Sequence, residues 1–269
     1  MNGAIRCEKA GAIAVLTLDR PAARNALTPR MLCELADAFM DFRDDAGLRV
    51  AVLTGAGDAA FCAGGDLGRT LPLLTGARAP EDAFDRRLLD DPGVLAASSL
   101  RDAPLSKPVI AAVNGACLAA GFELLLGTDI RVAAAHASFG LPEVTRALIP
   151  FAGALTRLPR QIPHAQAMEL LLTGWPMDAH AAQRCGLVNR VLPAAEVMPH
   201  ALELARRIAA NGPLAVQSVK RTVTDASGLP LPEGYRLEDR ARDAVFRSED
   251  AREGPRAFMD KRTPRYVGR

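Results

Sequence analysis

Two glutamates and two turns rich in small residues are the parts of this sequence that could do chemistry. Glu123 and Glu143 each stand just after a stretch that reads as a turn. The two small-residue turns are Ala63-Gly64-Gly65 and Ala119-Ala120-Gly121, where the backbone N–H groups can approach a ligand closely. Carboxylates move protons, and two preorganised N–H donors stabilise negative charge on a carbonyl oxygen. Together these parts predict proton transfer beside a polarised carbonyl, such as that of a thioester.

Each of these signals also has a simpler interpretation. A Gly-Gly pair is usually only a turn, and a lone glutamate in a helix is usually solvated. Glu143 could merely cap a helix begun by Pro142. The chemical interpretation is favoured because both turns follow apolar strands, whose ends bind ligands in open α/β sheets. The leucines at 124–126 predict that Glu123 is desolvated, with a raised pKa.

The composition indicates a globular protein with a packed core. Of 269 residues, 49% are hydrophobic and 24% are charged, and 33 basic side chains nearly balance 31 acidic ones. This balance gives no reason to expect nucleic acid or an anionic membrane as a partner. No apolar run is long enough for a membrane helix, and the start does not resemble a secretory signal. Five scattered cysteines without a CxxC pair favour reduced thiols, so we expect a cytoplasmic location. The four histidines lack ligand spacing, so we expect no metal.

Strands that alternate with helices predict a parallel, layered α/β core in the first half of the chain. The segment 68–101 is irregular, and it predicts either a mobile flap with a short helix near 81–90 or an ordinary surface insertion. The other expected elements of this half are a hairpin of 5–8 with 12–19, strands over 49–55, 107–113 and 130–134, a helix over 29–44 with Thr28 as its N-cap, and a helix over 121–126.

The second half of the chain is predicted to be mostly helical, with one extended link at 187–192. The change of pattern near residue 195 predicts a core over 1–195 and a helical region over 196–269. The expected helices are 152–160, 164–172, 178–185, 196–210, 214–225, 233–247 and 250–262.

The small-residue turns, the two glutamates and their flanking stretches resemble those of the crotonase superfamily, also called the enoyl-CoA hydratase/isomerase family. The resemblance extends over nearly the whole chain. The resemblance implies a repeated ββα spiral core with a helical C-terminal trimerisation region, assembled as a homotrimer or a dimer of trimers. The strongest matches are Asn-Ala-Leu at 25–27, Phe-Cys-Ala-Gly-Gly-Asp-Leu at 61–67, Lys-Pro-Val-Ile-Ala-Ala-Val-Asn-Gly at 107–115, and Phe-Gly-Leu-Pro-Glu at 139–143.

The resemblance also implies a role for each site residue. The N–H groups of Gly65 and Ala120 would form an oxyanion hole for an acyl-CoA thioester, and coenzyme A would enter only as part of that substrate. Glu123 would deprotonate the water that attacks carbon 3, and Glu143 would deliver the proton to carbon 2, although one water could share both roles. Contacts with coenzyme A are implied for Arg24, Ala26, Ala63, Gly64, Asp66 and Leu67, and for Phe258 and Lys261 reaching a neighbouring subunit.

Two filled carboxylate positions are the pattern of a hydratase, which adds water across the 2,3 double bond of a 2-enoyl-CoA in fatty-acid or related acyl-CoA degradation. A Δ3,Δ2-enoyl-CoA isomerase and a non-catalytic CoA-ester-binding relative remain alternatives. The sequence departs from the family at Ala119-Ala120-Gly121, where members of the family usually have a glycine-rich helix start. It also departs at Phe151 and Leu155, where small residues are usual. A large ring near the acyl group would restrict the chain that fits.

Overall fold

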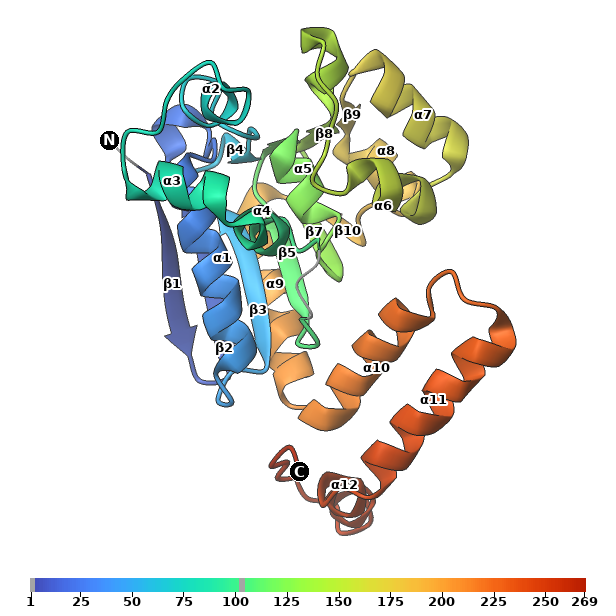
Figure 1. Cartoon of the computed structure of the whole chain (residues 1–269). Coiled ribbons are helices and arrows are strands. Elements are labelled where there is room, and N and C mark those ends of the chain that lie inside the picture. The colour runs from blue at the N-terminus through green and yellow to red at the C-terminus, as the bar shows by residue number, and fades with distance from the viewer. Residues whose placement is uncertain (1–2, 102–104) are drawn as a thin grey trace.

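A six-stranded sheet forms the centre of the computed structural model, which describes residues 3–101 and 105–269 (Figure 1). The strand order is β1-β2-β3-β5-β7-β10; β1 is antiparallel to β2, and the other neighbours are parallel. The strands β3 and β5 are buried throughout, as expected for apolar parallel strands covered on both faces. The strands span Ala4–Ala10 (β1), Ile13–Asp19 (β2), Val50–Gly55 (β3), Val109–Val113 (β5), Ile130–Ala134 (β7) and Arg190–Leu192 (β10). They confirm the predicted hairpin and the predicted parallel core.

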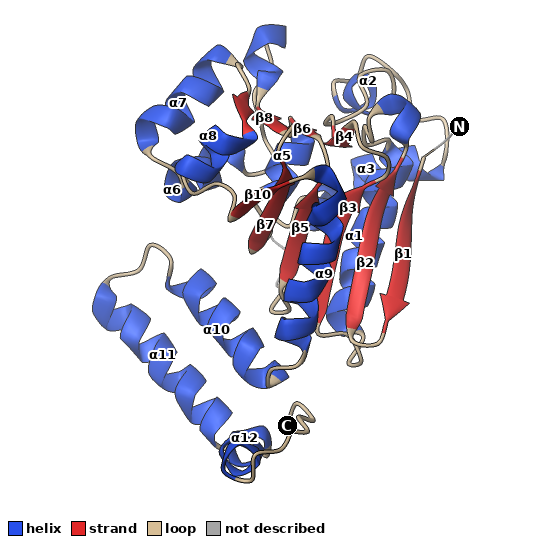
Figure 2. Ribbon diagram, turned by 180° about the vertical axis from the view of Figure 1, so that it is seen from behind, coloured by secondary structure: helices blue, strands red, loops and turns tan. Residues whose placement is uncertain are grey.

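Helices cover both faces of this sheet. Helix α1 (Pro29–Asp44) lies on one face, and α9 (Ala194–Ala209) lies on the other, as the two opposite views show (Figures 1 and 2). The N-cap prediction for α1 is confirmed, because the Thr28 hydroxyl oxygen accepts a hydrogen bond from the N–H of Met31 at 3.3 Å. The buried residues of α9 repeat every four positions, at Val197, Ala201 and Ala205, so one stripe of that helix faces the sheet.

A second, small sheet continues from the carboxyl ends of the large one. Its strands lie in the order β4-β6-β8-β9, and they span Ala60–Cys62, Ala116–Leu118, Ser138–Gly140 and Met177–Asp178. The pairs β3–β4, β5–β6 and β7–β8 each send one strand to the large sheet and the next to the small sheet. This repeated pairing agrees with the expected ββα spiral. The sequence did not predict the small sheet as such, because strands of two or three residues show no readable periodicity.

The segment 68–101 contains more structure than expected. One short helix was predicted near 81–90, whereas the structure has three, α2 (Thr70–Leu74), α3 (Ala83–Asp90) and α4 (Pro92–Ser98). The aspartates before two of them act as N-caps: Asp82 accepts from the N–H of Asp85 at 2.8 Å, and Asp91 accepts from the N–H of Gly93 at 2.9 Å. The prolines and short polar stretches that suggested an irregular segment therefore mark helix starts as well.

The remaining helices begin and end within a few residues of their predicted positions. Helices α10 and α11 form a hairpin beside the core that buries none of its residues, and α12 follows at the end of α11 (Figure 1). The division into 1–195 and 196–269 stays a prediction. These helices are α5 (Ala120–Leu125), α6 (Ala154–Gln161), α7 (His164–Thr173), α8 (Ala179–Arg184), α10 (Pro213–Ala226), α11 (Leu231–Phe246) and α12 (Asp250–Met259), and the 3-10 turns are η1 (Pro21–Ala23) and η2 (Pro142–Arg146). In the described ranges, no helix has the length and apolar character that crossing a membrane requires.

Candidate active site

Three parallel strands of the small sheet end at one edge, and each is followed by a predicted site residue. Gly65 follows β4, Ala120 follows β6, and Glu143 follows β8. The strands β4 and β8 each pair in parallel with β6. Because neighbouring parallel strands present their carboxyl ends at one edge, the sheet brings the three positions together. All three line the same cavity, which has a volume of about 640 Å³.

Backbone hydrogen bonds hold the turn after β4 and leave one of its N–H groups without a described acceptor. The N–H of Ala63 donates to the carbonyl of Arg24 at 3.0 Å, and the carbonyl of Gly64 accepts from the N–H of Leu27 at 2.8 Å. The N–H of Gly65 has no acceptor among the residues that the structure describes. A free backbone donor therefore lines the cavity at this turn.

The turn after β6 leaves a second N–H group over. Ala119 adopts φ 51° and ψ −129°, and its N–H donates to the carbonyl of Gly140 at 2.9 Å. The carbonyl of Ala119 accepts from the N–H groups of Phe122 and Glu123, which begins α5. The N–H of Ala120 opens this helix and, within the described part of the chain, donates to no acceptor.

Gly64 brings the two turns into contact. It has φ +104°, and a Cβ at this position would lie 2.6 Å from the Cβ of Ala119 and 3.5 Å from the nitrogen of Ala120. Only glycine fits such an approach, so the free N–H groups of Gly65 and Ala120 belong to adjacent stretches of backbone. Two neighbouring donors of this kind can stabilise a carbonyl oxygen that gains negative charge.

Glu123 is buried behind the wall of the cavity. The residue is 2% exposed, and its Oε1 accepts from the N–H groups of Ala152 at 2.7 Å and Ala154 at 3.1 Å. Burial is the main cause that raises the pKa of Glu123, the neighbouring backbone N–H groups lower it, and the negative charge of Glu143 adds to the rise; the net pKa is about 7. A carboxyl with this pKa can both take up and release a proton near neutral pH.

Glu143 lies on the cavity wall itself, in the turn η2. Its Oε2 is buried and has no hydrogen-bond partner among the described residues. Burial raises the pKa of Glu143, and the charge of Arg146 opposes that rise. A buried oxygen without a partner is costly in a folded protein, and it is common where a substrate or water supplies the missing bond. Glu123 is thus fully buried and Glu143 is half-buried, and of the two only Glu143 lines the cavity directly.

The rest of the cavity wall is mostly apolar and comes from elements that the sequence did not mark. Helices α2 and α4 contribute Leu71, Leu74 and Leu95, which were not predicted as site residues because their helices were not predicted either. Phe151 also lines the cavity and is 52% exposed, and contact of its ring with an acyl group stays a prediction. Leu155 is not among the lining residues.

The residues expected to contact coenzyme A fall into two groups. Arg24, Ala26, Ala63, Gly64, Asp66 and Leu67 lie in two strips of backbone joined by the bonds around Leu27. One of them has a structural role, because Asp66 forms an ion pair with Arg20 and accepts from the N–H groups of Gly68 and Arg69. Arg20 was not predicted as part of this region, since a lone arginine after a strand carries no signal. Contact of this group with coenzyme A stays a prediction.

Phe258 and Lys261 lie apart from the cavity. Phe258 is on α12 and is 86% exposed, and Lys261 follows that helix. Both views place α12 at the opposite end of the molecule from β4 and α5 (Figures 1 and 2). These two residues therefore cannot join the site of their own chain, and contact with a neighbouring subunit stays a prediction.

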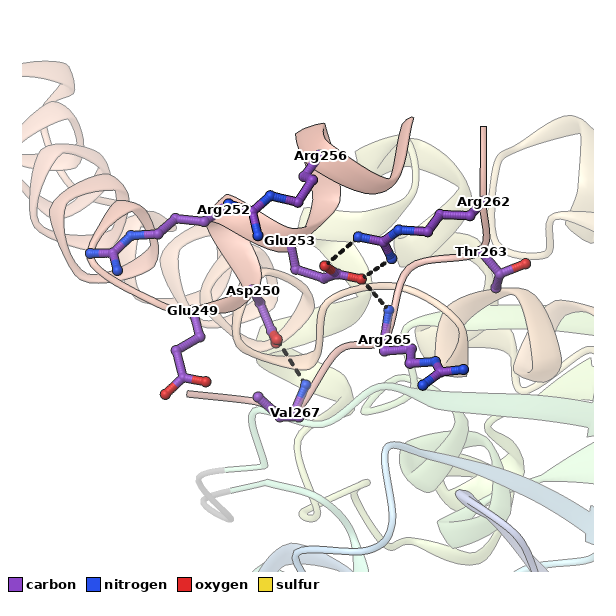
Figure 3. Close-up of a pocket in the computed structure, with 9 residues that line it drawn as sticks. All are labelled: Glu249, Asp250, Arg252, Glu253, Arg256, Arg262, Thr263, Arg265 and Val267. Atoms are coloured by element: carbon purple, nitrogen blue, oxygen red, sulfur yellow. Dashed lines mark hydrogen bonds and ion pairs between the residues drawn. The ribbon is translucent and has the colours of Figure 1, made fainter. Parts of the chain in front are cut away.

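A second cavity, of about 850 Å³, lies beside α12 (Figure 3), and none of its lining residues lines the cavity at Glu143. Its acidic side chains are occupied by the C-terminal tail: Glu253 binds Arg262 at 2.6 Å and the N–H of Arg265 at 2.8 Å, and Asp250 accepts from the N–H of Val267 at 2.8 Å. These bonds fasten the tail to the helix. Across residues 3–101 and 105–269, no three His, Cys, Asp or Glu side chains gather in a way that could hold a metal.

The comparisons with known proteins agree with this geometry. The family model described as Enoyl-CoA hydratase/isomerase matches residues 8–269. Enoyl-CoA hydratase EchA19 of Mycobacterium tuberculosis is 40% identical over 97% of this chain and 96% of its own length. Carnitinyl-CoA dehydratase of Proteus mirabilis is 41% identical over the full length of both chains. The crystal structure of enoyl-CoA hydratase from Bacillus anthracis superposes with a TM-score of 0.89 at 36% identity, over 100% of both chains. That of enoyl-CoA hydratase from Mycobacterium tuberculosis H37Rv superposes with a TM-score of 0.86 at 38% identity, over 98% of this chain and 99% of that one.

Proposed function

We propose, from the premise that the chain belongs to the enoyl-CoA hydratase/isomerase family, that it adds water across the 2,3 double bond of a 2-enoyl-CoA thioester. The observation that carries this proposal is a single cavity lined by two backbone donors without described acceptors and by the carboxyl group of Glu143, whose Oε2 is buried without a described partner. The second carboxyl, that of Glu123, lies behind the cavity wall and has a pKa of about 7. Relatives of about 40% identity are named both as hydratases and as dehydratases, which are the two directions of one reversible addition.

The proposed reaction begins when the thioester oxygen accepts hydrogen bonds from the N–H groups of Gly65 and Ala120. These donors draw electrons from the double bond and make carbon 3 open to attack. Glu123 in its charged form takes a proton from a water molecule, whose oxygen bonds to carbon 3. The electron pair of the double bond moves toward the thioester, and Glu143 in its neutral form gives its proton to carbon 2 and becomes charged. The buried, unpartnered Oε2 of Glu143 supports its place beside the reacting atoms.

Two alternatives predict different results from the same assay. An isomerase moves a proton between carbons 2 and 4 with one base, so Glu123→Gln would leave most of its activity. A non-catalytic relative would bind CoA esters without converting them. The free donors and the raised pKa values of both carboxyl groups favour catalysis by a hydratase over these two alternatives.

The test is to incubate the purified chain with crotonyl-CoA and longer 2-enoyl-CoA esters. Hydration removes the enoyl absorbance and adds the mass of one water molecule to the product. The expected result is both changes together for at least one ester. Loss of absorbance without added mass would instead indicate isomerisation, and tight binding with neither change would indicate a non-catalytic relative.

Assembly and location complete the proposal. We expect a homotrimer or a dimer of trimers, supported by the hairpin α10–α11, which buries none of its residues within one chain. In such an assembly Phe258 and Lys261 would reach the ligand of a neighbouring subunit. A cytoplasmic role in fatty-acid or related acyl-CoA degradation is part of the same proposal.

A further inference from the structure

The wall of the active-site cavity leaves few groups that could recognise a polar acyl chain. Its hydroxyl side chains are Thr70, Thr75, Ser98 and Ser99. Each of them donates its hydrogen to a backbone carbonyl rather than into the cavity. Thr70 donates to Leu27 at 2.7 Å and Thr75 to Leu71 at 3.0 Å. Ser98 and Ser99 both donate to Leu95, at 3.4 and 2.6 Å. A polar group on a substrate would find no hydroxyl donor free here.

The charged side chains on the wall are also confined to one place. Among the described lining residues they are Glu143 and Arg146, and both belong to the turn η2. Arg146 donates to the carbonyl of Pro142 and to the hydroxyl oxygen of Thr145, each at 3.2 Å. The two opposite charges lie near enough for Arg146 to lower the pKa of Glu143. A cation or a carboxylate on the substrate would therefore find its opposite charge in this cavity only beside a like charge, because Glu143 and Arg146 lie near each other.

Leucines supply a large part of the remaining surface. Leu71 and Leu74 are three positions apart on α2, so they share one face of that helix, and Leu95 faces the cavity from α4. All three are half-buried within the protein, and each keeps apolar surface exposed to the cavity. Burying a methylene against such a surface favours binding by about fourfold.

We infer that the preferred acyl group has more than four carbons, that its part beyond the reacting double bond is an unsubstituted hydrocarbon packed against α2 and α4, and that Leu74 and Leu95 set this preference. The inference rests on the proposed hydration of 2-enoyl-CoA esters and names the part of the substrate that the family does not specify. It assigns a function to the two helices of the irregular segment that line the cavity.

The test compares catalytic efficiency and binding along one series of chain lengths. For hydration, kcat/KM is measured with 2-enoyl-CoA esters of four, six and eight carbons. For binding, calorimetry gives the Kd of the matching saturated acyl-CoA esters, which cannot be hydrated. Both quantities should improve by roughly 15-fold for each added pair of methylenes that the cavity buries. Two further eight-carbon esters, one ending in a quaternary ammonium and one in a carboxylate, should bind at least tenfold more weakly than the hydrocarbon ester.

Leu74→Ala and Leu95→Ala identify the residues responsible. Each should lower kcat/KM for the eight-carbon ester by about tenfold, since truncation removes several methylene contacts, and should lower the four-carbon value by a clearly smaller factor. Leu89→Ala is the matched control, because Leu89 lies on α3 in the same segment, is 44% exposed and does not line the cavity. It should change neither value.

The outcomes separate the inference from the proposed function. Hydration of every ester with no gain from four to eight carbons, or equal binding of the charged esters, overturns the inference and leaves the hydratase standing. Binding that strengthens with chain length and weakens in both leucine variants supports the inference even if no ester is hydrated. In that last case it is the proposed reaction that fails.

Discussion

Glu123 illustrates how one residue can be made into a base by its surroundings. Burial favours its neutral form, whereas the N–H groups of Ala152 and Ala154 favour its charged form. The balance leaves a pKa of about 7, where an ordinary glutamate would already be fully charged. Such a group can take a proton from water in one step and release it in the next.

The first prediction is that the rate of hydration depends on the charge of Glu123. Because only the charged form can accept a proton, kcat/KM should fall as the pH drops below about 7. Glu123→Gln and Glu143→Gln should each lower kcat by about 10²–10⁴-fold. Stopped-flow or spectrophotometric rates across the pH range measure both effects. A rate that stays constant well below neutral pH would show that Glu123 is not the base.

The second prediction concerns stability at the same residue. The folded chain raises the pKa of Glu123 from 4.5 to about 7, so it prefers the protonated form more than the unfolded chain does. The contribution of the neutral carboxyl to stability is therefore complete below about pH 4.5 and is lost as the pH rises toward 7, amounting to about 3 kcal/mol. Glu123→Gln removes this ionisation and should raise the free energy of unfolding above pH 7, with a much smaller effect near pH 4.5.

Urea unfolding at the two pH values measures that difference. Glu169→Gln is a suitable control, because Glu169 is exposed on α7 and changes one charge without burial. An equal effect of Glu123→Gln at both pH values would contradict the assignment of a raised pKa.

At the scale of elements, the two turns after β4 and β6 work as a unit. Their free N–H groups are adjacent only because Gly64 has no side chain and because Ala119 accepts a backbone conformation that favours glycine. The family resemblance pointed to both turns, yet their contact depends on the small sheet, which the sequence does not reveal.

The third prediction is that these two positions depend on each other. Gly64→Ala should destabilise the chain by about 1–3 kcal/mol and lower kcat by about 10²-fold or more, because the new methyl would press on Ala119 and displace a donor. Ala119→Gly alone should stabilise by about 1 kcal/mol through relief of backbone strain. Ala119→Gly added to Gly64→Ala should restore part of the lost activity. Thermal unfolding and kcat measure the set.

Gly186→Ala is the control that separates the cost of backbone strain at a positive φ from the effect of the contact between Gly64 and Ala119. Gly186 has φ +82° and nothing within 4 Å of its Cβ position, so its substitution costs stability without touching the turns. It should leave kcat unchanged. If Gly186→Ala lowers kcat as much as Gly64→Ala does, general instability and not the contact explains the loss.

The elements differ in how much their sequences reveal. Helix α1 was predictable because a Thr-Pro start and a regular apolar stripe coincide, and the strands β3, β5 and β7 were predictable as short apolar runs. Helices α2 and α4 were not, because helices of five and seven residues amid prolines show no period. The leucines that α2 and α4 contribute to the cavity wall were missed for the same reason. The hydrogen bonds of Glu123 to the backbone at 152–154 were missed because those residues are distant from it in sequence.

At the scale of the whole molecule, the repeat is one of topology rather than of sequence. Each of three strand pairs crosses from the large sheet to the small one, and the site forms where the small strands end. The sequence has no internal repeat that indicates this arrangement, so the family resemblance rather than periodicity predicted the spiral. The glutamates could be selected from the sequence, whereas their unequal positions, one on the cavity wall and one behind it, required the structure.

The fourth prediction is that the molecule is complete only as an assembly. No residue of helices α10 and α11 is fully buried within one chain, and isolated helices of their length are marginal in water. Val223 and Phe246, which are 69% and 71% exposed, line one apolar groove of this hairpin. We therefore expect light scattering to give three or six times the 28.5 kDa mass of the chain. Val223→Glu combined with Phe246→Glu should lower that mass to a single chain.

Dissociation of the assembly should weaken substrate binding more than it disturbs the fold of each chain. If Phe258 and Lys261 of a neighbouring subunit hold the CoA ester, the separated chain should keep its circular dichroism spectrum while KM rises by about tenfold, the effect of losing one charged contact. Lys261→Ala in the intact assembly should raise KM similarly without changing the mass. Leu172→Glu, on an exposed position of α7, controls for the added charge and should leave mass and KM unchanged. A wild-type chain that is monomeric and fully active would show instead that one chain suffices, and that the exposed hairpin serves another purpose.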